Sequence, residues 1–297
     1  MVNRKSLIVY LVISFCAAWL LFILPLAIAV PGSSRYQVSA LICWAVAMWA
    51  PGLAALIVTK FSDKKPLIAL NLNHLGDKKT YLWAWLIPIA LAISAGFLTW
   101  ALGVGILDLE FTQIREAMAE SSELPFPTWL IIALQVLIAF TIGPLFNTVF
   151  GLGEELGWRG YLLPSLLPIG QWRAMILSGL IWGIWHIPVI LQGHNYPGYP
   201  IPGVFMMIIF CVLFGIILSW LYLRTISPWA PALAHGSLNA VAGLPLLFMP
   251  GVNMILGGTL TSLIGWIPMV AFISWLILTK RLPVLGKESN FPSARWR

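Results

Sequence analysis

Two carboxylates and an arginine stand close together in the apolar segment "GLGEELGWRG", which places Glu154, Glu155 and Arg159 within six positions. Glu155 and Arg159 are four residues apart, so on a helix they share a face and can pair, whereas Glu154 is rotated by about 100°. A carboxylate without a local partner in an apolar setting is suited to act as a general base on water. The alternative is that both carboxylates lie in water at a helix end.

Histidine occurs in two further apolar segments. In "SGLIWGIWHIPVI", His186 follows Trp182 by four residues on the same helical face, and Pro188 predicts a bend beside the histidine because proline has no N–H to donate. In "SPWAPALAHGSLNAVAG", His235 and Asn239 are also four residues apart, so two N–H donors can point at one spot. Taken singly, each histidine is more often a hydrogen-bonded residue of a helix bundle.

Small residues at four-residue spacing accompany these polar groups. Such spacing lets helix backbones approach closely in a membrane, although glycine is also simply common in membrane helices. We therefore expect the three segments to pack together and form one site. The small residues are Gly153 and Gly157, Gly179 and Gly183, and Ala232, Gly236 and Ala240.

The elements that must position these groups are membrane helices. The chain has 297 residues, of which 60% are hydrophobic and only 9% are charged, far from the balance of soluble domains. We predict an all-α, polytopic membrane protein of about eight transmembrane helices, forming a single integral membrane domain over 1–297 with the active site inside the bundle. The predicted spans are 7–30, 38–59, 81–103, 128–150, 172–191, 203–222, 228–246 and 257–279.

The formal charge of +7 does not require a nucleic-acid partner. If the N-terminus is cytosolic, all of the 17 Lys and Arg residues except Arg35 and Arg115 fall on the cytosolic side, as the positive-inside rule predicts. Both termini are therefore predicted to be cytosolic, and the protein to lie in the plasma membrane if its source is bacterial.

Other nucleophiles are poorly supported. Cys16, Cys43 and Cys211 fall in predicted spans without CxxC spacing and are interpreted as small buried hydrophobic residues. Ser237 lies beside His235, but no GxSxG-like serine and no pair of intramembrane aspartates is present.

The segments "EELGWR", "WGIWH" and "HGSLN" match, in order, the motifs EExxxR, [FW]xxxH and HxxxN. In this the chain resembles the CPBP intramembrane proteases, also called the Abi family, which include the type II CAAX prenyl endopeptidases. The resemblance covers about 140–245, which we expect to be the core of the protein.

This resemblance implies a peptidase in which Glu154 and His186 activate the attacking water while His235 and Asn239 stabilise the oxyanion. Amide hydrolysis needs both a positioned base and donors aimed at the developing oxygen. The resemblance assigns supporting roles to Glu155, Arg159 and Trp182.

Metal dependence stays open at this stage. Zinc is an alternative, with Glu154, His186 and His235 as candidate ligands, and the family has been described both as metalloproteases and as glutamate enzymes. The HExxH signature is absent, and three ligands on three helices are a weaker signal than a local motif. We expect no required metal.

The expected partners are the lipid bilayer and a peptide or protein substrate, either prenylated or membrane-embedded. One alternative function is a transporter, in which intramembrane charge marks a substrate path, although no matching halves with paired broken helices are evident. Another is a non-proteolytic bacteriocin-immunity or regulatory membrane protein using the same polar cluster.

Overall fold

The computed structural model describes residues 3–119 and 126–284. These residues form helices and their connections, without a strand. The prediction of an all-α protein is confirmed.

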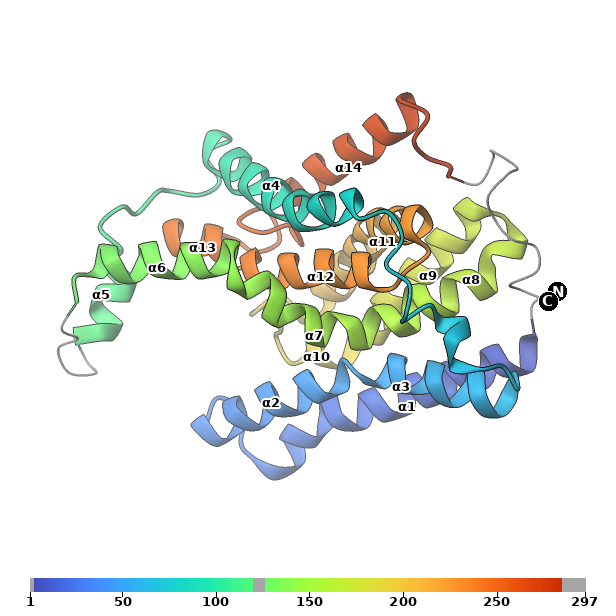
Figure 1. Ribbon diagram of the computed structural model, residues 1–297. Helices are drawn as coiled ribbons and strands as arrows, with labels where there is room; N and C mark the ends of the chain where they lie inside the picture. Colours follow the sequence, from blue (N-terminus) through green and yellow to red (C-terminus); the bar gives the residue numbers. More distant parts are fainter. Residues whose placement is uncertain (1–2, 120–125, 285–297) are drawn as a thin grey trace.

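The N-terminal region is a helical hairpin. Helix α1 (Arg4–Ile28) packs against α2 (Ser34–Ala47) and α3 (Ala50–Ile57), which ends in the π-helical turn η1 (Val58–Ser62). Figure 1 shows this hairpin along one side of the bundle, next to α7 (Ile142–Gly157). A short 3₁₀ turn, η2 (Leu67–Leu70), follows in the connection to α4 (Lys79–Ala101).

Helix α12 (Trp229–Val241) lies in the middle of the molecule. It packs against α7 on one side and against α4 (Lys79–Ala101) on the other, and α14 (Leu263–Leu278) packs on α4 (Figure 1). The long helix α11 (Pro200–Thr225) packs against both α12 and α9 (Gln171–Trp185). Helix α13 (Leu244–Phe248) continues the chain after α12.

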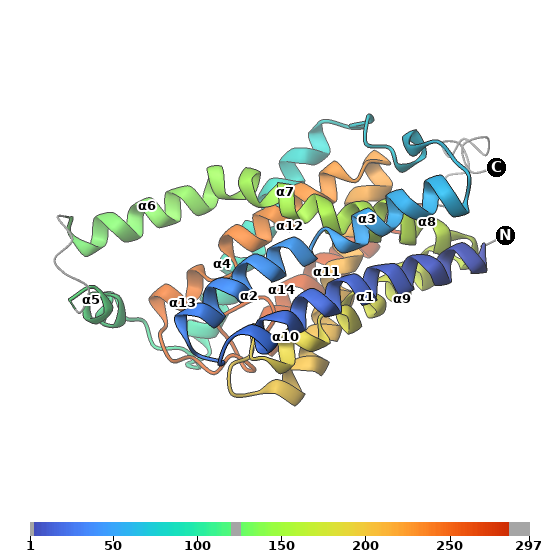
Figure 2. The same cartoon turned by 90° about the horizontal axis from the view of Figure 1, so that it is seen from below.

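The helix that carries both glutamates follows a sharp bend. Helix α6 (Thr128–Phe140) meets the helical segment Ile142–Ile169, which begins with α7 (Ile142–Gly157), at an angle of 49°. Pro144 has no N–H for the Phe140 carbonyl four residues earlier, and the Trp85 indole of α4 donates to that carbonyl instead, at 2.9 Å. Figure 2 shows α6 reaching away from the bundle towards α5 (Thr112–Ala119).

A π-helical turn follows the glutamates. This turn, η3 (Trp158–Leu162), is closed by the Leu163 N–H, which donates to the Trp158 carbonyl five residues earlier. Short turns over α8 (Leu163–Leu166) and η4 (Leu167–Ile169) complete the segment. Single π turns inside α-helices are frequent at functional sites.

The predicted bend beside His186 is confirmed. Helix α9 (Gln171–Trp185) ends at this histidine, and α10 (Ile187–Leu191) starts after it with Pro188 in its first turn. The first turn of a helix tolerates proline because its N–H groups have no partner within the helix.

The predicted number of eight membrane spans is not confirmed. Within the described residues, five helices are long and apolar enough to cross a membrane, or six if the bent pair is one span. The predicted span 172–191 is divided at His186, and the predicted span 257–279 is helical only over the 16 residues of α14. Apolar composition identified these segments correctly, but it does not report whether a helix is continuous.

The long apolar helices make this an integral membrane protein. The cytosolic placement of both termini stays a prediction.

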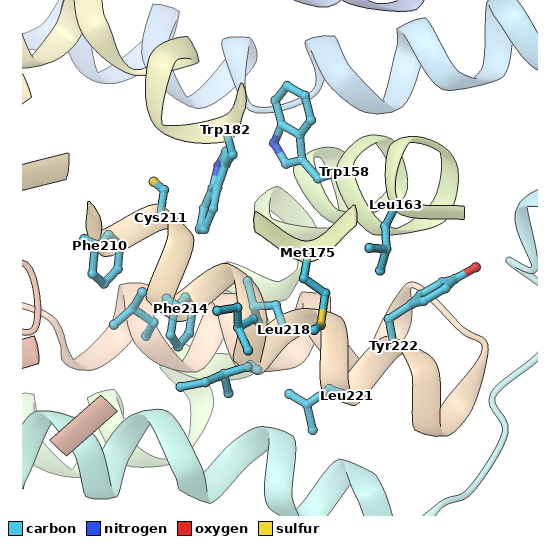
Figure 3. Packing of buried hydrophobic residues seen from close by; sticks show 14 of the residues in the cluster. Trp158, Leu163, Met175, Trp182, Phe210, Cys211, Phe214, Leu218, Leu221 and Tyr222 are labelled. Carbon is cyan, nitrogen blue, oxygen red and sulfur yellow. The ribbon is translucent and has the colours of Figure 1, made fainter. Parts of the chain in front are cut away.

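The centre of the bundle is filled by large buried side chains, and Figure 3 shows Trp182 between Trp158 and Cys211, with Phe210 and Phe214 of α11 below.

Candidate active site

Glu154 is buried and held by two tryptophans. Its Oε2 accepts hydrogen bonds from the indole N–H of Trp158 at 3.3 Å and of Trp182 at 2.6 Å. Trp158 lies one turn further along the chain, and Trp182 comes from α9, so the carboxylate joins the two motif helices. In the described part of the chain no group donates to the other oxygen, Oε1. Glu154 therefore has one oxygen fixed and one available.

Glu155 has different partners. Its Oε1 accepts from Arg159 Nη1 and from His235 Nδ1, both at 2.9 Å, and Glu155 and Arg159 are fully buried. The pairing predicted from the four-residue spacing is confirmed. The second bond was not predicted: Glu155 connects α7 to α12 and orients the histidine of the third motif.

His186 lies at the break between α9 and α10. Its Nδ1 is 2.9 Å from the carbonyl of Trp182 and 3.8 Å from Sγ of Cys211. A carbonyl only accepts hydrogen bonds, so Nδ1 carries the proton, and in the neutral ring Nε2 keeps its lone pair.

Trp182 lies at the centre of the cluster. Its ring centroid is 5.7 Å from that of His186 and 5.4 Å from that of His235. The guanidinium carbon of Arg159 lies 4.6 Å from the same ring, within the range of a cation–π interaction. The tryptophan assigned a supporting role from the sequence thus contacts all three motifs.

Two aromatic residues of the site were missed by sequence reasoning. Trp158 donates to Glu154, and the Trp185 ring lies 4.9 Å from His186 and 6.0 Å from Trp158. The spacing of Glu154 and Trp158 is the same four residues that identified the Glu155–Arg159 pair, so that signal was available.

Asn239 stands apart from this network. It is exposed, whereas His235, one turn earlier, is only 5% exposed. No hydrogen bond joins Asn239 to another described residue of the site. The structure therefore leaves its amide free, and its proposed contact with the oxyanion remains a prediction.

The glycines permit close packing, but not mainly between the three motif helices. Gly236 does face α7: a Cβ there would lie 2.5 Å from Thr148 N. Gly153 faces the α2–α3 junction, where a Cβ would lie 2.7 Å from the Met48 carbonyl oxygen. Gly157 also faces α3, and Gly179 and Gly183 face α11. The expectation that these pairs bring the polar helices together was correct only for the third motif.

In residues 3–119 and 126–284, no three side chains of His, Cys, Asp or Glu are grouped as metal ligands. The candidate zinc ligands Glu154, His186 and His235 are therefore not assembled as a three-ligand site in the described residues. The expectation that no metal is required stays a prediction.

Comparison with known proteins finds a family that matches the part of the chain carrying the three motifs. Residues 127–241 match the family described as "Type II CAAX prenyl endopeptidase Rce1-like". The chain is also similar to the CAAX prenyl protease 2 of Methanococcus maripaludis, with 46% identity over 44 residues, which is 14% of this chain and 16% of that protein. The resemblance indicated by the three motifs is therefore confirmed: over residues 127–241 the chain matches the type II CAAX prenyl endopeptidase Rce1-like family.

Proposed function

We propose that this protein is a membrane endopeptidase that hydrolyses a peptide bond in the manner of a CAAX prenyl protease. The observation that carries the proposal is Glu154, a buried carboxylate with Oε2 held by two indoles and Oε1 left free. A base must be placed in one orientation before it can take a proton from water. The match of residues 127–241 supports peptide hydrolysis as the reaction.

In this mechanism Glu154 and His186 activate the water. Oε1 of Glu154 accepts a proton as the oxygen of water attacks the peptide carbonyl. The neutral His186 presents Nε2 as a second acceptor, since its Nδ1–H is used by the Trp182 carbonyl. The proton is then delivered to the leaving amine, as general acid–base catalysis requires.

His235 and Asn239 stabilise the oxyanion. Nδ1 of His235 must carry a proton, because the Glu155 carboxylate only accepts. For Nε2 to donate to the oxyanion as well, the ring must be the doubly protonated imidazolium. The exposed Asn239 amide adds a second donor from the next turn of α12, and removing one such donor typically costs about 10²–10³ in kcat.

The substrate is a peptide or protein that reaches the site from the bilayer. The matched relative is named for CAAX prenyl protease activity, so a prenylated C-terminal peptide is the first substrate to test. The match spans only 16% of that relative, and a membrane-embedded segment is the second substrate to test. We propose that the core over 140–245 carries all the catalytic groups and works without a metal, in a plasma membrane if the source is bacterial.

The test is cleavage by purified protein in detergent. The substrates are a farnesylated CAAX peptide, its unprenylated form and a panel of membrane-protein segments, with cleavage followed by mass spectrometry. We expect wild type to cleave at least one substrate and Glu154→Gln to lower kcat/KM by about 10²–10⁴. Exhaustive chelation is expected to leave the activity unchanged.

The matched control is Glu110→Gln, which removes an exposed carboxylate outside the site and should cleave like wild type. If wild type and Glu154→Gln cleave at equal rates, Glu154 is not the base. If no substrate is cleaved, a transport, immunity or regulatory role for the same cluster takes the place of the peptidase.

A further inference from the structure

The peptide unit that joins Trp185 to His186 is held at only one end by its own helix. The His186 N–H donates to the Gly183 carbonyl at 3.1 Å. The Trp185 carbonyl has no backbone donor in the described part of the chain, because Pro188 has no N–H and the Val189 N–H donates to the His186 carbonyl instead. Trp185 is buried, so bulk water does not satisfy this carbonyl.

Helix α1 supplies the missing donor. The indole N–H of Trp19 donates to the Trp185 carbonyl oxygen at 3.0 Å. The same helix brings the Phe22 ring to 4.7 Å from the Trp185 ring, which in turn lies 4.9 Å from His186. Helix α1 therefore contacts the break through one hydrogen bond and one aromatic pair, although it lies outside the family match at residues 127–241.

The two bonds together fix a plane. The N–H and C=O of one peptide unit are rigidly coplanar. Because each of them is held by a hydrogen bond, the orientation of this plane is fixed. The plane in turn sets the direction in which the His186 side chain leaves the backbone. The ring itself is then tied by Nδ1 to the Trp182 carbonyl. Without the Trp19 bond, only the hydrogen bond from the His186 N–H to the Gly183 carbonyl holds this peptide unit in orientation.

We propose that Trp19 is a positioning residue for His186, acting through the peptide unit between Trp185 and His186. The inference rests on the proposed function, since it assigns a helix outside the matched segment to the alignment of one of the groups that activate water. Trp19 does not contact the reacting atoms.

The kinetic test compares Trp19→Phe with Trp229→Phe. Both replace a half-buried indole by a smaller aromatic ring, and each removes one N–H donor to a backbone carbonyl, because Trp229 donates to the Leu72 carbonyl at 2.8 Å. We expect Trp19→Phe to lower kcat by about ten-fold through misalignment, with KM within two-fold of wild type and thermal unfolding equal to that of Trp229→Phe. Equal kcat values for the two variants would overturn the proposal.

A second measurement does not depend on cleavage. Nitrogen NMR of ¹⁵N-histidine-labelled protein in detergent, with the His186 signals identified by their loss in His186→Ala, reports the environment of this ring. We expect Trp19→Phe to shift the His186 signals and Trp229→Phe to leave them in place. Unchanged signals in Trp19→Phe refute the positioning role even if the protein is a peptidase, whereas shifted signals with no cleavage by wild type refute only the proposed function.

Discussion

Two arginine–glutamate pairs in this molecule show how far burial changes the meaning of one interaction. Arg159 and Glu155 are 2.9 Å apart with both side chains fully buried. Arg115 and Glu110 are 3.5 Å apart, with 60% and 83% of the side chains exposed. Each member of the exposed pair is solvated with or without its partner. In the buried pair, removal of either residue strands the other charge in an apolar interior.

The buried pair also has neighbours that the exposed pair lacks. His235 donates to the same oxygen of Glu155, and Trp182 covers the guanidinium of Arg159. Arg159 nevertheless keeps Nε and Nη2 without a hydrogen-bond partner among the described residues. A buried ion pair whose donors lack partners is weak evidence that the pair stabilises the folded protein. It is better evidence that the pair orients the side chains around it.

The largest expected effect is on Arg159. Replacement by Met leaves Glu155 charged and buried beside only a histidine, so we expect the free energy of unfolding to fall by about 3–5 kcal/mol. The measurement is thermal or chemical unfolding in detergent, with Arg115→Met as the exposed counterpart. Equal losses in the two variants would contradict the contrast between the pairs.

A double variant separates stability from orientation. In Glu155→Met with Arg159→Leu both charges are gone, and replacing a buried ion pair by apolar residues is often neutral. We expect most of the lost stability to return while peptide cleavage stays low, because His235 has lost its carboxylate partner. Recovery of full activity would show that the pair serves only folding.

The next effect is on the donors to Glu154. Trp182→Phe removes the 2.6 Å bond and leaves Trp158 as the remaining indole donor. A hydrogen bond to a charged group contributes about 1.5–3 kcal/mol, so kcat/KM should fall by roughly 10–100-fold. Steady-state kinetics beside Trp220→Phe, a change at a buried tryptophan of α11, would distinguish a specific effect from a packing defect.

A smaller, graded effect is expected from pH. Glu154 must be ionised to accept a proton, so activity should be lost at low pH. The oxyanion role requires a proton on both nitrogens of His235, so activity should also be lost as pH rises through the pKa of that ring. Each limb should change by about ten-fold per pH unit, and a profile of kcat/KM without a high-pH limb would argue against an imidazolium.

The smallest effect is expected at the exposed pair. Glu110→Gln should leave the free energy of unfolding within about 0.5 kcal/mol of wild type. Any small difference should disappear in high salt, because exposed charges are screened. A loss comparable to that of Arg159→Met would mean that this region is packed in a way the structure does not show.

Spacing along the sequence predicted the features that depend on residues close together in the chain. The Glu155–Arg159 pair and the helix break before Pro188 follow from helix geometry and from the missing proline N–H, and the structure shows both. The four-residue spacing of Glu154 and Trp158 was equally informative but was not used.

Contacts between distant segments were beyond this reasoning. The bond from His235 to Glu155 spans 80 positions, and that from Trp19 to Trp185 spans 166. Nothing in spacing tells which face of α12 meets α7, so the predicted convergence of His235 and Asn239 did not foresee that only His235 is buried. The count of eight spans is not confirmed, because composition locates apolar segments without showing where a helix is interrupted.

The bond between His235 and Glu155 also has a consequence for the net charge of the bundle interior. With Glu154 and Glu155 ionised, Arg159 and a protonated His235 supply two positive charges, so the buried cluster is electrically neutral although both cations contact Glu155. A low-dielectric interior penalises any uncompensated charge. The proton that His235 needs in order to donate to an oxyanion is therefore the same proton that makes the cluster neutral, so folding and catalysis favour one protonation state.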